Sequence, residues 1–258
     1  FRYTWTNTIN VNKDFANGHS LNAVAGMEMF QGKWYTSNFT GYDLNSDMMQ
    51  SPAGIGDKSG SSLFPPSIGG GRTMSNLMSF FAQASYSIAN KYNFSASLRH
   101  DTSSKFYEDN ASATFWSVGA SWLISSESWF DNAKWLNQLK LRASYGTTGN
   151  QDGVSDFGTF DGYYNSSYNG ESGYSHGQLG NSELRWETSA QTNVGLDVSV
   201  LDSRVNVTFD FYNIKTKDLY MSKNISMTSG FSSILANAGS IVNRGVELGV
   251  NTTDRKST

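Results

Sequence analysis

Apolar and polar residues alternate along most of the chain with a period of two, which is the pattern of β-strands with two unlike faces. In the opening segment Phe1, Tyr3 and Trp5 share one parity, whereas Thr4 and Thr6 occupy the other. The alternation restarts near several later residues: Leu21, Met78, Tyr92, Trp116, Leu139, Trp186, Val205 and Val246. It predicts about nine strands, many of them long enough to cross a bilayer at the tilt of a membrane barrel.

The connections between these strands alternate between short and long. Short turns are expected at Asn17-Gly18, Asn90-Lys91 and Asp202-Ser203, because such residue pairs suit tight hairpins. Long excursions fall between them, over residues 31–75, 102–113, 147–185 and 222–235. Outer-membrane barrels place short turns on the periplasmic side and long loops outside the cell. The sequence therefore predicts an all-β fold, an antiparallel transmembrane β-barrel with long extracellular loops and short periplasmic turns.

One connection, over residues 125–137, is longer than the short-turn side predicts. Its apolar residues indicate a short amphipathic helix at the membrane interface: Trp129, Phe130, Ala133, Trp135 and Leu136. A soluble β-sandwich is the alternative fold, because its strands also alternate. The loops of a sandwich need not take turns in length, and its outward faces carry more Lys and Glu than the Ser, Thr and Asn faces of this chain. The pattern favours the barrel.

The composition agrees with a β-rich chain and excludes several other classes. Of the 258 residues, 14% are aromatic, 16% are charged and 25 are glycine. Cysteine is absent, which rules out disulfides and thiolate metal sites. The formal net charge of −3 offers no basic surface for nucleic acid. No stretch reaches the roughly 18 consecutive apolar residues that a membrane-spanning helix needs.

A series of motifs runs through the second two thirds of the chain. One is Asn237-Ala238-Gly239, followed by residues 245–248. Others occupy residues 97–106, 139–151, 179–181, 184–188, 191–197, 211–219 and 229–231. Together they resemble TonB-dependent receptors of the SusC/RagA type. The resemblance covers residues 77–252, whereas the first 75 residues share only the general strand pattern of the family and none of its motifs.

This resemblance implies a plugged barrel of about 22 strands. About nine strands do not close such a barrel, and an open sheet leaves unpaired edges in lipid. The chain is therefore expected to be a piece of a longer polypeptide. Residues 1–258 would form part of one transmembrane β-barrel domain, with the plug domain and the remaining strands outside this chain.

The resemblance also implies a function, the energy-coupled import of a nutrient, an oligosaccharide or peptide, across the bacterial outer membrane. The expected partners are the lipid bilayer with its lipopolysaccharide, a SusD-like surface lipoprotein over the mouth, and the TonB complex, reached through segments outside this chain. No cofactor is expected. Arg142, Asn193 and Asp197 lie on the inward parity and are expected to line the lumen or plug. There, satisfying hydrogen bonds is a commoner role than contacting substrate.

Aromatic and amide residues in two long loops are candidate ligand contacts. Aromatic faces stack on sugar rings, and amides bond sugar hydroxyls. One set consists of Tyr163, Tyr164, Asn165, Tyr168 and Tyr174, and the other of Trp34 and Tyr35. The loops and interfacial girdles of barrels are aromatic-rich in any case. Contact with the lid lipoprotein is the stronger expectation for these residues.

Three further motifs do not support a reaction or a metal site. Residues 173–177 have G-x-S-x-G spacing, but no helical pattern and no later histidine follow them. Residues 43–47 begin like a calcium loop, yet Met48 and Gly54 replace the required Gly and Glu. No metal is predicted, and loop-bound calcium stays an unsupported alternative. Residues 69–72 lack the ending of a phosphate loop and predict a hinge or turn.

No enzyme is predicted, because no carboxylate, Ser/His or metal constellation is present. Two alternatives to active transport stay open. The first is a structural or scaffold barrel, a component of a larger outer-membrane surface assembly without transport of its own. The second is a passive porin, which the motifs disfavour. A TonB-contacting segment ahead of a plug would favour the transporter over the scaffold.

Overall fold

The computed structural model describes residues 1–42, 51, 55, 67–130 and 135–253. Within them, nine strands form one antiparallel sheet. In spatial order they are β1 (Arg2–Phe15), β2 (His19–Thr40), β3 (Ser67–Ile88), β4 (Tyr92–Ser103), β5 (Ser112–Leu123), β6 (Leu136–Asn150), β9 (Glu187–Val200), β10 (Val205–Lys217) and β13 (Ser240–Thr252). Two hairpins form separate small sheets: β7 (Gly162–Tyr168) with β8 (Glu171–Gln178), and β11 (Tyr220–Asn224) with β12 (Ser233–Asn237).

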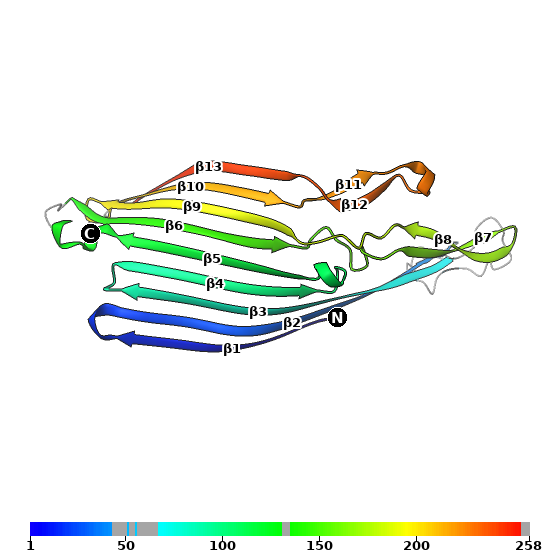
Figure 1. Ribbon diagram of the computed structural model, residues 1–258, viewed down its shortest axis with the longest axis horizontal. Helices are drawn as coiled ribbons and strands as arrows, with labels where there is room; N and C mark the ends of the chain where they lie inside the picture. The colour runs from blue at the N-terminus through cyan, green and yellow to red at the C-terminus, as the bar shows by residue number, and fades with distance from the viewer. Residues whose placement is uncertain (43–50, 52–54, 56–66, 131–134, 254–258) are drawn as a thin grey trace.

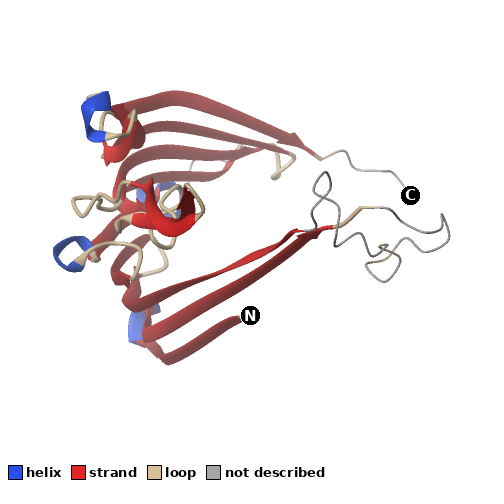
Figure 2. Cartoon of the chain, turned by 90° about the vertical axis from the view of Figure 1, so that its right-hand side faces the viewer, coloured by secondary structure: helices blue, strands red, loops and turns tan. Residues whose placement is uncertain are grey.

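The strands run up and down, with tight turns at one end of the sheet and the long connections at the other (Figure 1). The backbone is left-handed at Asn17 (φ 64°), Asn90 (φ 55°) and Asp202 (φ 55°), a conformation that Asn and Asp tolerate in tight hairpins. Seen from the loop end, the nine strands follow an arc (Figure 2). The predicted nine strands and the alternation of short and long connections are confirmed.

Strands reach further into the longest connection than the sequence predicted. Residues 31–40 continue β2 and residues 67–75 begin β3, so the loop predicted over residues 31–75 was too long. The hinge or turn predicted at residues 69–72 is also wrong, because these residues lie inside β3. The reason is the register, which pairs β2 and β3 without interruption as far as Thr40 and Ser67. Backbone hydrogen bonding thus outweighs the weak strand preference of the three glycines.

Other connections contain regular structure that the sequence did not predict. The β7–β8 hairpin lies within residues 147–185, and the β11–β12 hairpin overlaps residues 222–235. On the short-turn side, two 3₁₀ turns follow β5, Ile124–Ser126 and Ser128–Phe130, and β6 begins at Leu136. The middle of the predicted amphipathic helix, residues 131–134, lies outside the described residues. No helix in the described part of the chain is long and apolar enough to cross a membrane.

One face of the sheet is an exposed apolar belt. Directly paired residues point to the same side of a sheet, so the register places Val194, Phe211 and Val246 side by side, and Leu196, Phe209 and Leu248 next to them. Leu248 is 69% exposed. On β4 and β5 the belt runs from the Tyr92–Trp122 pair to the Leu98–Trp116 pair, roughly 20 Å at the rise of an antiparallel strand. Soluble proteins rarely expose such a surface, whereas membrane barrels turn one about 25 Å tall to lipid.

The opposite face, here called the polar face, holds every acidic side chain of the nine strands. They are Asp14, Glu28, Asp101, Glu187, Asp197, Asp210 and Glu247. The charged residues on the apolar parity are all basic: Lys13, Lys33, Arg72, Lys215, Lys217 and Arg244. The apolar face therefore carries only basic charges, whereas the polar face carries all the acids together with Arg2, Arg99, Lys140 and Arg142.

At the short-turn end, three side chains converge on the carboxylate of Glu127. The Tyr92 hydroxyl donates a hydrogen bond of 2.6 Å, the Trp122 indole one of 3.1 Å, and the Lys91 ammonium forms an ion pair at 3.1 Å. These interactions, led by the Tyr92 hydrogen bond, hold the pKa of Glu127 below its usual value. Glu127 thereby ties the connection between β5 and β6 to the aromatic rim of the apolar belt.

The lowered pKa of Glu127 predicts a loss of stability in acid. The contribution is present above the unfolded-state pKa and is lost as the pH falls through the lower folded-state pKa. We expect Glu127→Gln to reduce the heat stability of the full-length barrel in detergent near neutral pH. Near pH ~3 the difference from the wild type should shrink. The midpoint of the heat-induced gel-mobility shift measures it. Glu183→Gln, on an exposed loop, is the control, and equal losses in both variants would contradict the account.

Candidate functional site

An ion-pair cluster crosses three strands on the polar face. Arg142 on β6 donates from Nε and Nη2 to the two carboxylate oxygens of Asp197 on β9, both at 2.9 Å. Nη2 also reaches Asp210 on β10 at 3.0 Å. One guanidinium thus pairs with two carboxylates, and the cluster keeps one net negative charge. Charge-assisted contacts of this kind fix side-chain position more firmly than neutral hydrogen bonds do.

A glycine makes this three-strand reach possible. Gly195 lies on β9 between Arg142 and Asp210 in the register. A Cβ atom on Gly195 would collide with Asp210 Oδ1 and lie 2.6 Å from Arg142 Nη2. Both contacts are too short for any side chain. Gly195 is therefore a place of close approach, where the guanidinium crosses the strand.

A second cluster of the same form lies on β2, β3 and β4. Arg99 donates from Nε to Asp101 at 2.8 Å, and from Nη2 to Ser79 at 2.8 Å and Glu28 at 3.4 Å. The Arg99 guanidinium also lies over the aromatic ring of Phe81, 5.8 Å from its centroid. Ser79 is fully buried beneath these groups. Here too a single arginine joins two carboxylates and leaves one negative charge.

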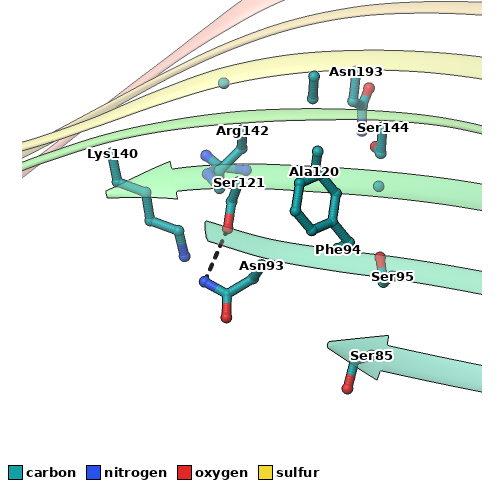
Figure 3. A pocket seen from close by; sticks show the side chains of 13 residues that line it. Ser85, Asn93, Phe94, Ser95, Ala120, Ser121, Lys140, Arg142, Ser144 and Asn193 are labelled. Atoms are coloured by element: carbon teal, nitrogen blue, oxygen red, sulfur yellow. Dashed lines mark hydrogen bonds between the residues drawn. The ribbon is translucent and has the colours of Figure 1, made fainter. Parts of the chain in front are cut away.

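Beside Arg142 the polar face has a shallow hollow (Figure 3). Its volume is about 280 Å³, and Lys140, Arg142, Ser144 and Asn193 line it together with residues of β4 and β5. Across it, Asn93 donates to the hydroxyl of Ser121 at 3.4 Å. The side-chain oxygen of Asn193 is buried and accepts no hydrogen bond from the described residues. Such an acceptor is normally satisfied by a partner.

At the loop end, the connections fold into a small hydrophobic core that we call the loop cap. Its buried residues are Phe106, Phe115, Val154, Leu184 and Trp186. Trp186 packs against Phe106 and Phe115 at ring-centroid distances of 5.2 and 5.8 Å, and its indole donates to the carbonyl of Ala111. Phe115 is on the polar face, opposite Arg99 in the register. The loop cap therefore closes over the polar face of the sheet.

Asn237 and Tyr220 join the β11–β12 hairpin to the rest of the loop cap. The Asn237 side chain accepts from the Arg185 amide and donates to the carbonyls of Arg185 and Asp218. The Tyr220 hydroxyl donates to the carbonyl of Asn150 at 3.0 Å and accepts from the amide of Glu187 at 3.1 Å. Burial raises the pKa of Tyr220 to about 12. The phenol therefore stays a donor at any physiological pH.

The predicted ligand loop is a β-hairpin with two different faces. The register places Tyr163 opposite His176 and Asn165 opposite Tyr174 on one face. The rings of Tyr163 and His176 meet edge to face at 4.5 Å. Tyr164 and Tyr168 fall on the other face because their parity differs. The five predicted contact residues are thus divided between the two faces, three on one face and two on the other.

Trp34 and Tyr35, which were predicted on a long loop, lie inside β2. Their side chains point to opposite faces, since Trp34 pairs with Thr73 and Tyr35 with Arg72. The indole of Trp34 folds back over Gly32, and the Arg72 guanidinium lies over the Tyr35 ring at 5.5 Å. Their placement on a loop was wrong because the glycine-rich partner strand was taken for loop, and their role as ligand contacts stays a prediction.

In the described residues, the remaining motifs form no catalytic or metal site. Ser175, the centre of the G-x-S-x-G match, lies within β8 and does not precede a helix. The calcium-like residues 43–47 lie outside the described part of the chain. Among described residues, no group of three or more His, Cys, Asp or Glu side chains could hold a metal.

The sequence predicted Arg142 and Asp197 as inward-facing residues, but it did not indicate Asp210 or any residue of the Arg99 cluster. The missing signal was the register between strands, which brings residues far apart in sequence to one point. The motif residues Leu184, Trp186 and Asn237 carried the family resemblance, but their packing role was not apparent from the motif. Parity alone would have placed Glu28 and Asp101 on the polar face.

Enlarging Gly195 is expected to break the Arg142–Asp210 contact. Gly195→Ala should lower the stability of the full-length barrel by about 1 kcal/mol, the upper range for a partly exposed ion pair. The midpoint of urea-induced unfolding in detergent measures the change. Gly173→Ala, on β8, is the control, because the added methyl group meets only one atom within 4 Å, at 3.9 Å. Unchanged stability of Gly195→Ala would contradict the proposed crossing.

Comparisons with known proteins agree with this architecture. The profile of the family described as "TonB dependent receptor-like, beta-barrel" matches residues 1–254, including the first 75 residues that resembled the family only in style. TonB-dependent receptor P39 of Formosa agariphila is 36% identical over 247 residues, which are 95% of this chain and 23% of that protein. TonB-dependent receptor SusC of Bacteroides thetaiotaomicron is 35% identical over 187 residues, 69% of this chain and 19% of that protein.

Among solved structures, the RagAB peptide transporter superposes with a TM-score of 0.88 at 27% identity. The match covers 99% of this chain and 28% of the RagAB chain. The chain therefore spans about a quarter of the length of the relatives that it matches. The profile match and the relatives show that this chain belongs to the TonB-dependent receptor β-barrel family, with similarity to its SusC and RagA members.

Proposed function

We propose that this chain forms part of the wall of an outer-membrane importer that depends on TonB. The observation that carries the proposal is the sorting of the two faces, one an exposed apolar belt and the other holding every acid of the nine strands. A sheet of this kind is stable only where one side meets lipid and the other meets water or protein. The apolar belt would face lipid, and the polar face would line the lumen.

Within the proposed importer, the polar face holds the plug. The Arg142 cluster and the Arg99 cluster each keep one net negative charge. The buried oxygen of Asn193 still needs a donor. A plug that presents basic side chains and N–H groups would complement all three. This gives Arg142, Asn193 and Asp197 a structural role at the wall, in which they position the plug.

The proposed cargo is an oligosaccharide or a peptide, and the β7–β8 hairpin is its contact on this chain. Tyr163, Asn165 and Tyr174 share one face of the hairpin, and Tyr174 is 81% exposed. Aromatic rings and an amide suit both sugar and peptide ligands. The solved relative is described as a peptide transporter, which supports peptides as the first candidates. A SusD-like lipoprotein is the proposed lid above this hairpin.

Uptake by cells that carry the full-length protein tests this proposal. Labelled peptide and oligosaccharide pools are the probes, and a protonophore removes the energy source for TonB. Tyr163→Ala/Tyr174→Ala should lower initial uptake of the transported pool by about tenfold, from the loss of two aromatic contacts. Tyr164→Ala/Tyr168→Ala, on the opposite face of the same hairpin, is the matched control and should stay within about twofold.

The outcomes separate the candidates. Uptake that stops with the protonophore and with deletion of the gene supports the importer. Uptake that persists with the protonophore but requires the gene indicates a passive pore. If neither pool depends on the gene while the protein stays in the outer membrane, a scaffold role replaces transport. Equal effects of the two tyrosine pairs would remove the ligand role of the hairpin.

A further inference from the structure

Four aromatic rings gather where the β7–β8 hairpin meets the connection between β11 and β12. The ring of His176 meets that of Tyr163 edge to face at 4.5 Å, and it also lies 6.2 Å from the ring of Phe231. Tyr174 is a diagonal neighbour of Tyr163 on the same face, about 7–8 Å away at the Cα atoms. Tyr163 is 60% exposed and Tyr174 is 81% exposed. We call these four side chains the ring cluster, and the hairpin places them at the loop end, beyond the ends of β6 and β9 (Figure 1).

The described part of the chain places no cation over the ring cluster. The Lys and Arg side chains that lie over aromatic rings face other residues, namely Phe15, Phe30, Tyr35 and Phe81. Residues 151–184, which include the β7–β8 hairpin, contain no Lys or Arg at all. The negative face of an aromatic ring attracts a cation that lies within about 6 Å of the ring centroid. The ring cluster is therefore open to a cation from outside the chain.

The connection that carries the ring cluster is acidic. Residues 151–186 join β6 to β9 and contain five acidic residues and one basic residue, Arg185, which gives a net charge of −4. The acids are Asp152, Asp156, Asp161, Glu171 and Glu183. In the described part of the chain none of the five forms an ion pair, and Arg185 is already paired with Asp218. The connections at the short-turn end together carry no net charge. Among the connections, the excess of negative charge therefore lies at the loop end.

We propose that the ring cluster binds a lysine or arginine side chain of the cargo, so that the importer selects basic peptides. This inference rests on the proposed function, in which a peptide is one of the two candidate cargoes. Charge complementarity selects the occupant, because the rings attract a cation and the unpaired acids raise the concentration of cations around them. A neutral oligosaccharide could stack on the same rings but would gain nothing from the acids, and an acidic peptide would be repelled by them.

Binding of two labelled peptides to the purified full-length protein tests the proposal, with fluorescence anisotropy in detergent as the readout. One peptide alternates alanine and arginine, and the other has citrulline, a neutral side chain of nearly the same shape, in place of arginine. The wild type should bind the arginine peptide about tenfold more tightly, because the rings and the acids both favour the charge. Added salt should reduce this preference, because it screens exposed charges.

The role of the rings is tested by Tyr163→Leu/Tyr174→Leu, which removes two rings and keeps apolar side chains. The preference for the arginine peptide should fall to about threefold, since the acids then supply most of the distinction between the two peptides. Tyr164→Leu/Tyr168→Leu, on the opposite face of the same hairpin, is the matched control and should keep the wild-type preference within about twofold.

The role of the charge is tested by Asp161→Asn/Glu171→Gln. Asparagine at position 161 keeps an oxygen that can accept the hydrogen bond from the Gly180 amide. Binding of the arginine peptide should weaken about threefold, whereas binding of the citrulline peptide should stay within about twofold. Asp14→Asn/Asp202→Asn is the matched control, because it removes two exposed acids at the short-turn end, and neither peptide should change by more than about twofold.

Equal binding of the two peptides by the wild type would overturn the proposal. A preference for arginine that Tyr163→Leu/Tyr174→Leu leaves unchanged would also overturn it. Displacement of the arginine peptide by a neutral oligosaccharide at equal concentration would do the same, in favour of a sugar site.

Uptake of the same two peptides by cells separates this inference from the proposed function. Uptake of the arginine peptide alone, dependent on the gene and sensitive to the protonophore, supports both. Equal uptake of the two peptides under those conditions would keep the importer and reject selection by charge. If neither peptide is taken up while the purified protein still prefers arginine, peptide import is contradicted and the binding site stands.

Discussion

A backbone that crosses a bilayer must satisfy its own hydrogen bonds, because lipid offers no partners. Between neighbouring strands the nine-stranded sheet meets this constraint through antiparallel ladders, and even the glycine-rich start of β3 keeps its register with β2. The ladder then fixes which side chains share a face. Every later feature of the molecule, from the apolar belt to the ion-pair clusters, follows from that division into two faces.

On the polar face, strand pairing brings together charged residues that are far apart in the sequence. Arg142 and Arg99 each join acids on neighbouring strands into one cluster, and Gly195 leaves the room for one of these crossings. Partly exposed ion pairs of this kind contribute little stability singly. They hold charged groups at fixed positions on the polar face. The loop cap adds the buried apolar packing that the thin sheet cannot provide for itself.

Much of the fold could be predicted from the sequence, because period-two alternation and tight-turn residues are local signals. The number of strands, their direction and the two faces follow from Phe1, Tyr3, Trp5 and the residues that repeat their parity. These local signals do not predict which residues of two strands pair when the strands are separated by a long connection. Residues 67–75 were expected to be loop because glycine disfavours strands, yet β2 supplies their hydrogen-bond partners. Trp34 and Tyr35 were misplaced for the same reason.

The candidate site was predictable only in part. Parity identified Arg142, Asn193 and Asp197 as inward residues, but the register was needed to bring Asp210 into their cluster. The aromatic composition singled out residues 163–174, whereas the hairpin that separates their faces is set by pairing with β8. The motif around Trp186 and Asn237 was recognised by resemblance, and its physical basis, the packing of the loop cap, appears only in three dimensions.

The most direct test of the account is the environment of two adjacent residues on β13. The chain has no cysteine, so Val246→Cys and Glu247→Cys each give a single site for a spin label. The full-length labelled protein is placed in liposomes, and the rates at which the spin label collides with oxygen and with a water-soluble nickel complex are measured. Frequent collisions with oxygen indicate a lipid environment, and frequent collisions with nickel indicate water. The account predicts that the label at 246 collides mainly with oxygen, and the label at 247 mainly with nickel or with neither if the plug covers it. Oxygen-dominated collisions at 247, or nickel-dominated collisions at 246, would contradict the division into a lipid face and a lumen face.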